Sequence, residues 1–413
     1  MRVRVRRSVV RGIVEAPPSK SWAIRLILLA SIADGESEIL NVPEADDVKA
    51  ALNMAKALGA SIEYSNGVVR VRPMISNCGG YAYLGGSGTT LRIGLALASL
   101  CRNPITIDGD DTLRSRPIED LVKALRALGA SVAGDRLPLT VRGPVRGGLV
   151  EIRGDVTSQY VSGLMFLGSM VGLKIIVKGR LVSRQYPELT ARILNEHGCL
   201  VEPIEGGYAV NPCRPRPVNR HVPGDYALSA FYSTSALATG GWVKVTNLPA
   251  PMGLGDDSIV DILGMMGAKS TYTDGSWIVE PGDSLKSIEV DLADAPDLAP
   301  VVASIAPFTQ GVSKVTGVEH LAYKESNRLL TIVDTLRAFG VDASYQGGIV
   351  IKGSSTHGAY VKCPNDHRIA MMAGVLGLAS IGETIIDDAE CVSKSNPQYW
   401  ASLKALGGYV EVV

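Results

Sequence analysis

Apolar and polar residues recur along this chain in one pattern that is repeated six times. Each copy has apolar residues at helical spacing, then a stop containing glycine, then two short strand-like segments joined by a turn. In the fifth copy, Gly340 ends a predicted helix whose apolar face comprises Leu329, Ile332, Val333, Leu336 and Phe339. The copies cover residues 47–72, 118–142, 187–211, 257–280, 326–352 and 397–413.

The glycines of the six stops are evenly spaced. They stand at positions 59, 129, 198, 267, 340 and 407, so the successive intervals are 70, 69, 69, 73 and 67 residues. Self-similarity at a nearly fixed period indicates a repeated architecture. An interval of this length has room for two helices and several strands, so each repeat is predicted to be a small α/β unit.

Each repeat also contains a second, more apolar helix, which we expect to be buried. These helices are predicted at 23–33, 90–100, 161–171, 227–237, 298–306 and 369–379. Six units divide naturally into two domains of three. The proline-rich segment 213–217 is typical of a linker, and Pro17-Pro18 is a second break. We therefore expect one domain at 20–218 and a second at 1–19 and 219–413, with two crossings between them.

Composition narrows the class of protein. The 413 residues are 46% hydrophobic and 20% charged, and 41 Lys and Arg balance 41 Asp and Glu. This balance argues against a general nucleic-acid binder. The basic N-terminus lacks a signal-peptide core, and the longest apolar run, 26–33, is too short to span a bilayer, so we expect a cytoplasmic protein without membrane contact.

The six cysteines show no pairing signal. No two form a CxxC pair, and their spacing matches no zinc site, so we expect free thiols in a reducing cytosol and no metal. They stand at positions 78, 101, 199, 213, 363 and 391.

Donor-rich segments precede four of the apolar helices. Residues 18–21, 85–90, 154–159 and 365–368 combine glycine, hydroxyl or amide groups, and the first turns add Lys20, Arg25, Arg92 and Arg368. A helix N-terminus offers free N–H groups and a positive dipole end, which suit anions. Ordinary capping explains any one of these segments, but four together favour a convergent site for small polyanions. For Arg92, a structural ion pair is favoured over ligand contact.

The segment Lys324-Glu325-Ser326-Asn327-Arg328 starts the fifth repeat and concentrates two cations and a carboxylate on one turn. Such a group could hold an anion and move a proton. The alternative is a solvated helix start with a salt bridge between residues three apart. Residues 85–90 lack the lysine of a P-loop, and no dinucleotide fingerprint is present, so no cofactor is expected.

Taken in order, the motifs resemble those of the 5-enolpyruvylshikimate-3-phosphate (EPSP) synthase family over the whole chain. They are Lys20-Ser21-x-x-x-Arg25, Gly88-Thr89-x-x-Arg92, Arg116-Pro117, Thr157-Ser158-Gln159, Ser183-x-x-Tyr186, Pro296-Asp297, Lys324-Glu325-Ser326-x-Arg328, Asn365-Asp366-His367-Arg368 and Lys394. The family fold is two domains of three βαβαββ units. Gly86 and Asn327 depart from the family pattern, which usually has Asn and Asp there.

The resemblance implies transfer of the enolpyruvyl group of phosphoenolpyruvate to the 5-hydroxyl of shikimate 3-phosphate, in the shikimate pathway to chorismate and aromatic amino acids, with glyphosate at the phosphoenolpyruvate site. The implied acid–base residues are Glu325, at the methylene carbon, and Asp297, at the hydroxyl, with Lys20 assisting. The implied phosphoenolpyruvate ligands are Lys20, Gly88, Arg116, Gln159, Arg328, Arg368 and Lys394. The implied shikimate 3-phosphate ligands are Lys20, Ser21, Arg25, Thr157, Ser158, Gln159, Ser183, Tyr186, Asp297, His320 and Lys324.

Two alternatives stay open on the sequence. One is a UDP-N-acetylglucosamine enolpyruvyl transferase, although residues 110–117 lack the loop cysteine common in those enzymes. The other is a phosphate-ligand binding protein without catalysis, which two acid–base carboxylates would not require. We expect a monomer acting on two small-molecule substrates, closing on them because the implied ligands divide between the two domains.

Overall fold

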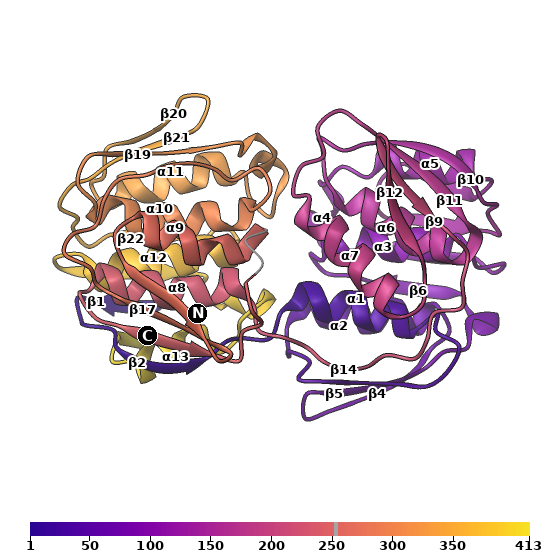
Figure 1. The fold of residues 1–413 in the computed structure, drawn as a ribbon, viewed down its shortest axis with the longest axis horizontal. Helices are drawn as coiled ribbons and strands as arrows, with labels where there is room; N and C mark the ends of the chain where they lie inside the picture. The colour runs from indigo at the N-terminus through magenta and orange to yellow at the C-terminus, as the bar shows by residue number, and fades with distance from the viewer. Residues whose placement is uncertain (252–254) are drawn as a thin grey trace. The chain divides into compact units, whose positions relative to one another are not determined.

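The computed structural model describes residues 1–251 and 255–413. Within these residues the chain forms two compact units (Figure 1). One, Pro18–Val222, is a single stretch of chain and is called the continuous unit here; the other combines Met1–Pro17 with Pro223–Val413 and is called the split unit. Each unit has its own core of buried apolar residues.

Three four-stranded sheets of one design make up the strands of the continuous unit. In each, the first two strands are parallel and the other neighbours are antiparallel. The strand orders are β14 (Asn219–His221), β3 (Ser37–Leu40), β5 (Val68–Arg72), β4 (Ser61–Ser65); β6 (Gly80–Tyr83), β7 (Ile105–Asp108), β9 (Leu139–Arg142), β8 (Ser131–Ala133); and β10 (Gly148–Arg153), β11 (Leu173–Lys178), β13 (Gly207–Val210), β12 (Val201–Ile204).

The split unit repeats the same design three more times. Its sheets are β2 (Gly12–Glu15), β15 (Val243–Thr246), β17 (Ser276–Glu280), β16 (Lys269–Thr273); β18 (Glu289–Asp291), β19 (Val312–Thr316), β21 (Ile349–Lys352), β20 (Ala343–Tyr345); and β22 (Tyr360–Lys362), β23 (Glu383–Asp387), β1 (Val3–Arg6), β24 (Tyr409–Val412). The expected sixfold α/β repeat is therefore confirmed. The N-terminal strand β1 lies between β23 and β24 and completes the last sheet.

The chain passes between the two units twice, once after β2 and once after β14. Strand β2 precedes β3 in the chain but pairs with β15 of the split unit, whereas β14 pairs with β3 of the continuous unit. Because β14 belongs to the first sheet, residues 219–222 lie in the continuous unit. The two units divide after residues 17 and 222, whereas the sequence placed the divisions after residues 19 and 218. The linker 213–217 ends one strand before the second crossing.

The glycine stops end one helix in every repeat. These helices are α2 (Asp46–Ala57), α5 (Glu119–Ala127), α7 (Gln185–Glu196), α9 (Ile259–Met265), α11 (Arg328–Ala338) and α13 (Tyr399–Ala405). All six stop glycines have a left-handed backbone, with φ between +82° and +101°. An L-residue with a Cβ is strained in that conformation, which explains why glycine marks each repeat.

The apolar helices are buried as expected. They are α1 (Lys20–Ala30), α3 (Gly88–Ala98), α6 (Gln159–Val171), α8 (Tyr226–Ala238), α10 (Ala299–Ile305) and α12 (His367–Ala379). Short helical turns α4 (Asp111–Arg114), η1 (Ile75–Asn77), η2 (Gly255–Ser258), η3 (Pro296–Leu298), η4 (Ala306–Phe308), η5 (Glu319–Tyr323) and η6 (Ala389–Lys394) complete the described elements. The charged residues of the buried helices all lie within the first two turns, so these helices present charge only near their N-terminal ends.

The expectation of free thiols is wrong for four of the six cysteines. Cys78 is bonded to Cys101, and Cys199 to Cys213, with Cα atoms 5.9 and 5.4 Å apart. Sequence separations of 23 and 14 gave no hint of these pairs, because tertiary packing brings the cysteines together.

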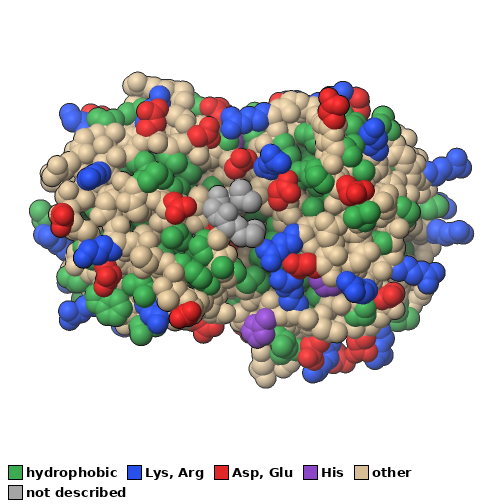
Figure 2. Space-filling model, in the orientation of Figure 1, with side chains coloured by type: hydrophobic (Ala, Val, Ile, Leu, Met, Phe, Trp, Pro, Cys, Tyr) green, Lys and Arg blue, Asp and Glu red, His purple; other side chains and the backbone are tan. Residues whose placement is uncertain are grey.

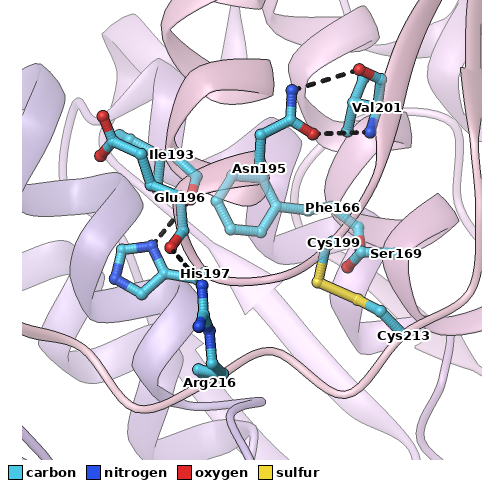
Figure 3. The surroundings of a disulfide bond; sticks show 10 residues. All are labelled: Phe166, Ser169, Ile193, Asn195, Glu196, His197, Cys199, Val201, Cys213 and Arg216. Atoms are coloured by element: carbon cyan, nitrogen blue, oxygen red, sulfur yellow. Dashed lines mark hydrogen bonds between the residues drawn. A yellow bond between two sulfur atoms is a disulfide. The ribbon is translucent and has the colours of Figure 1, made fainter.

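The Cys199–Cys213 bond fixes the start of the linker (Figure 3). Beside it, the Asn195 side chain bonds both backbone groups of Val201, and the His197 ring bonds the carbonyl of Ile193. The linker residue Arg216 donates to the carbonyl of Glu196 at 3.0 Å. The segment between the third and fourth repeats is therefore anchored to α7.

Surface charge is mixed. On the face shown in Figure 2, Lys and Arg side chains are interspersed with Asp and Glu on each unit. In the described ranges, the structure contains no helix that combines the length and the apolar character needed to span a bilayer.

Candidate active site

Three buried helices of the continuous unit are not capped by the side chain of their N-cap residue. Among the described residues, the side chains of Ser19, Ser87 and Ser158 make no capping bond to α1, α3 or α6. Capping therefore does not account for the segments before α1 and α3, whereas before α6 the Thr157 hydroxyl accepts one helix N–H. At the fourth, before α12, the Asp366 side chain does accept the N–H of Arg368.

Lys20 opens α1 and is held by a carboxylate of the next helix. Its Nζ lies 2.7 Å from Oδ2 of Asp47, and both side chains are largely buried. The Asp47 carbonyl in turn accepts the hydroxyl of Thr90 in the first turn of α3. Asp47 thus fixes the ammonium group of Lys20 beside the start of α3.

A second group surrounds Gly88. An added Cβ at Gly88 would lie 2.5 Å from Nη1 of Arg116 and 2.8 Å from Nη1 of Arg92, so both guanidinium groups lie against this helix start. Arg92 donates to the carbonyls of Gly88 and Pro117, which ties α3 to the segment carrying Arg116. The Gln159 amide donates to Thr89 at 3.2 Å. The structure therefore brings Gly88, Arg116 and Gln159 together.

Two atoms of this group have unused hydrogen-bonding capacity. In the part of the chain that the structure describes, Nε of Arg116 and Oε1 of Gln159 are buried without a hydrogen-bond partner. Only 9% of the surface of Arg116 is exposed to solvent. A buried cation beside free helix N–H groups is a favourable place for an anion.

Arg25 joins a third group, from α1 and α7. Its guanidinium donates to Thr190, to the carbonyl of Ser21 and to the carbonyl of Tyr186, and it lies over the Tyr186 ring. Burial lowers the pKa of Arg25 to about 10. Ser183, just before α7, is buried with a left-handed φ of +52°. A non-glycine residue in that conformation is a local strain of the kind found at ligand sites.

The hydroxyls of Thr157 and Ser158 precede α6 in the same loop as Gln159. Ser158 is buried, and the Thr157 hydroxyl accepts the N–H of Gln159 at 3.3 Å.

In the split unit, Arg328 is the centre of a charged network. It is only 1% exposed and binds three carboxylates: Asp297 at 2.9 Å, Glu325 at 2.7 Å and Asp366 at 2.8 Å. The salt bridge between residues three apart is present, but it is buried, so the solvated alternative is wrong. We call the seven residues of this network the acid–base cluster: Asp297, Lys324, Glu325, Arg328, Asp366, Arg368 and Lys394.

Asp297 lies among three cations. Arg328 and Arg368 donate to its two oxygens, each at 2.9 Å, and Nζ of Lys324 is 3.8 Å away. Burial by itself would raise the pKa of Asp297, but Arg368, Lys324 and Arg328 outweigh it and hold that pKa well below 3.8. Asp297 is therefore ionised at neutral pH.

Glu325 bridges Arg328 and Lys394. One oxygen accepts from Arg328 and the other lies 3.7 Å from Nζ of Lys394, which ends η6. His320 is buried in η5, four residues before Lys324. The cluster thus gathers residues from four separate segments of the chain.

Sequence reasoning gave no separate role to two carboxylates, Asp47 and Asp366. Asp366 is fully buried and accepts two bonds from Arg328 and one from the hydroxyl of Ser326. Its place before an apolar helix was visible, but its partner 38 residues earlier was not. Nothing in the spacing of Lys20 and Asp47 distinguishes that pair from a solvated one.

Known proteins match this chain along its full length. A sequence profile of EPSP synthase (3-phosphoshikimate 1-carboxyvinyltransferase) matches residues 5–403. The chain belongs to the EPSP synthase family. A 3-phosphoshikimate 1-carboxyvinyltransferase of Caldivirga maquilingensis is 56% identical over 408 residues, 98% of this chain and 99% of that protein. Another, of Sulfurisphaera tokodaii, is 40% identical over 99% of both chains.

Solved structures agree on the fold. An EPSP synthase of Acinetobacter baumannii, 24% identical, covers 100% of this chain and 99% of its own with a TM-score of 0.85. The chain is thus an enolpyruvyl-transferase-fold member of the EPSP synthase family, and the expected family is confirmed. The UDP-N-acetylglucosamine alternative is not favoured, since these relatives carry the 3-phosphoshikimate name.

Proposed function

We propose that this chain transfers the enolpyruvyl group of phosphoenolpyruvate to the 5-hydroxyl of shikimate 3-phosphate, releasing phosphate, with the residues below in named roles. The observation that carries the proposal is the acid–base cluster, in which Asp297 and Glu325 bind the same buried guanidinium of Arg328. Two carboxylates fixed relative to each other by one cation provide the proton acceptor and the proton donor that the reaction needs.

The first half of the reaction makes a tetrahedral adduct. Glu325 delivers a proton to the methylene carbon of phosphoenolpyruvate, so that the neighbouring carbon becomes electrophilic. The 5-hydroxyl of shikimate 3-phosphate attacks that carbon, and Asp297 accepts the hydroxyl proton with help from Lys20. The low pKa of Asp297 supports a carboxylate that is ionised before substrate binds.

The second half reverses the protonation. The new methyl group returns a proton to Glu325, the carbon–oxygen bond to phosphate breaks, and the vinyl ether forms. The anionic groups of phosphoenolpyruvate and the leaving phosphate need cations throughout. We assign the carboxylate of phosphoenolpyruvate to Arg328 and Arg368. We assign the phosphate of phosphoenolpyruvate to Lys20, Gly88, Arg116, Gln159 and Lys394.

The unused donor of Arg116 supports its assignment to phosphate. For shikimate 3-phosphate we assign the phosphate to Thr157, Ser158, Ser183 and Lys324, the carboxylate to Ser21 and Arg25, and the ring to Tyr186, with His320 and Gln159 completing the contacts. Within the described residues, the Arg25 guanidinium bonds to a hydroxyl and to two carbonyls rather than to a carboxylate, which supports its assignment to a substrate carboxylate.

The proposed active form is a cytoplasmic monomer, because every assigned group comes from one chain and both substrates are phosphorylated and do not cross membranes unaided. The disulfides are compatible with this location, since intracellular proteins of some hyperthermophiles carry them.

One coupled assay tests the activity. Phosphate release from phosphoenolpyruvate is measured with shikimate 3-phosphate or UDP-N-acetylglucosamine as acceptor, and light scattering gives the molar mass. We expect release with shikimate 3-phosphate only. Release with the nucleotide sugar alone would support the rival transferase. Tight binding of both proposed substrates without turnover would support a binding protein.

A further inference from the structure

The two cysteines outside the disulfides, Cys363 and Cys391, lie against each other. Cys363 follows strand β22 and Cys391 lies within η6, and the residues are 3% and 8% exposed. Their sulfur atoms are 2.7 Å apart. A disulfide bond is about 2.04 Å long, so the sulfurs are about 0.7 Å beyond bonding distance.

The pairing of the other four cysteines supports the pairing of Cys363 with Cys391. The other four form two disulfides in the continuous unit, so all six cysteines of the chain fall into three pairs. We propose that Cys363 and Cys391 form a third disulfide, the only one in the described part of the split unit, which cross-links two segments of the acid–base cluster.

The cross-link would join segments that carry cluster residues. In the reduced form, the Cys363 thiol donates to the carbonyl of Asp366 at 3.2 Å. Oxidation removes that donor, but Cys363 still stands only three residues before Asp366, whose carboxylate holds Arg328. Cys391 stands three residues before Lys394, whose Nζ faces Glu325. A covalent link between the sulfurs therefore ties the partner of Arg328 to the partner of Glu325.

The chemistry is thiol–disulfide exchange with an external disulfide, such as oxidised glutathione or a protein disulfide. One thiol, as thiolate, attacks the external disulfide and releases one thiol from it. The second cysteine attacks the mixed disulfide and releases the other thiol. Two protein thiols are oxidised, one external disulfide is reduced to two thiols, and the two protons pass to these products.

Burial of the two thiols determines at which stage of folding this exchange can take place. The hydrogen bond with Cys363, together with burial, raises the pKa of the Cys391 thiol, which disfavours the thiolate in the folded protein. We therefore expect the bond to form during folding, while both cysteines are accessible, and to resist reductant afterwards.

The test counts thiols in the full chain. Protein is refolded with oxidised glutathione, denatured in urea near neutral pH with excess N-ethylmaleimide, which alkylates free thiols through the thiolate, and measured by intact mass and peptide mapping. We expect no alkylated cysteine and a linked pair of peptides containing Cys363 and Cys391. Alkylation of both these cysteines, with the other two pairs still linked, would overturn the proposal.

A second measurement tests the cross-link between cluster segments. Backbone hydrogen exchange of residues 389–394 is compared between oxidised wild type and C363A/C391A, with C199A/C213A as the matched control lacking a bridge in the other unit. We expect faster exchange in C363A/C391A only. Equal exchange in all three proteins would refute the positioning role. Should C363A/C391A fail to fold, C391A alone, which keeps the contact of Cys363 with Asp366, replaces it.

Discussion

Replacing Asp366 by Asn tests whether this carboxylate positions Arg328. The fully buried Asp366 accepts two bonds from Arg328 and caps α12. The amide keeps one acceptor oxygen but loses the charge, and its NH₂ group faces a guanidinium donor. Asp225 is a matched control, because it caps the buried helix α8 through the N–H of Leu228.

The expected magnitude follows from the contacts. A hydrogen bond between charged groups contributes about 1.5–3 kcal/mol. The full cost of an orphaned buried charge, about 3–5 kcal/mol, does not apply, because Asp297 and Glu325 still bind Arg328. We expect D366N to lose about 2–3 kcal/mol in free energy of unfolding. Through its capping bond, D225N should lose well under about 1 kcal/mol, since Asn caps helices about as well as Asp.

Tryptophan fluorescence can be restricted to the split unit, which contains Asp366. Of the four tryptophans, only Trp22 lies in the continuous unit. In a W22F background, urea unfolding followed by fluorescence therefore reports on the split unit. Phosphate release should show kcat/KM reduced about tenfold to a hundredfold in D366N, because a displaced Arg328 misaligns the reacting groups. The positioning role of Asp366 would be refuted if D366N and D225N lost the same free energy of unfolding to within about 0.5 kcal/mol.

Three further predictions concern the assigned residues. E325Q cannot transfer the proton at the methylene carbon, so kcat should fall about 10²–10⁴-fold with little change in binding; activity within tenfold of wild type would remove Glu325 from that role. In G88A the new Cβ meets Arg116 at 2.5 Å, so the KM for phosphoenolpyruvate should rise and glyphosate affinity should fall further; unchanged values for both in titrations would place Gly88 outside the site. Because the pKa of Asp297 is depressed, its ionised form stabilises the fold above about pH 4 and this stability is lost as the pH falls through the lower folded value. The difference in unfolding free energy between wild type and D297N should therefore shrink between pH 4 and pH 2, and a constant difference would contradict the ion pairs.

The sequence predicted the repeats because their signal is local. Each stop glycine has a positive φ that an L-residue with a Cβ resists, so its position shows directly in the chain. The apolar helices were equally visible, since a helix buried all round is apolar on every side and carries few charged residues.

What the sequence could not predict depends on tertiary neighbours. The partners Asp47 of Lys20 and Asp366 of Arg328 come from other helices, and no spacing rule identifies them. The same holds for the disulfides, whose cysteines are brought together only by packing. Motif resemblance named the charged residues of the acid–base cluster, but the single guanidinium that joins its three carboxylates was visible only in the structure.

The position of β1 has a consequence for synthesis on the ribosome. The continuous unit is complete once Val222 has emerged, so it can fold while the rest of the chain is still being made. The split unit cannot, because Val3 pairs with both Ile386 and Val412, near the opposite end. Throughout translation β1 is a strand with two open edges, which favours mispairing with other chains. Deleting β24 should therefore impair the pairing of β1 as well, and a nascent chain should need protection at β1 until β23 and β24 have emerged.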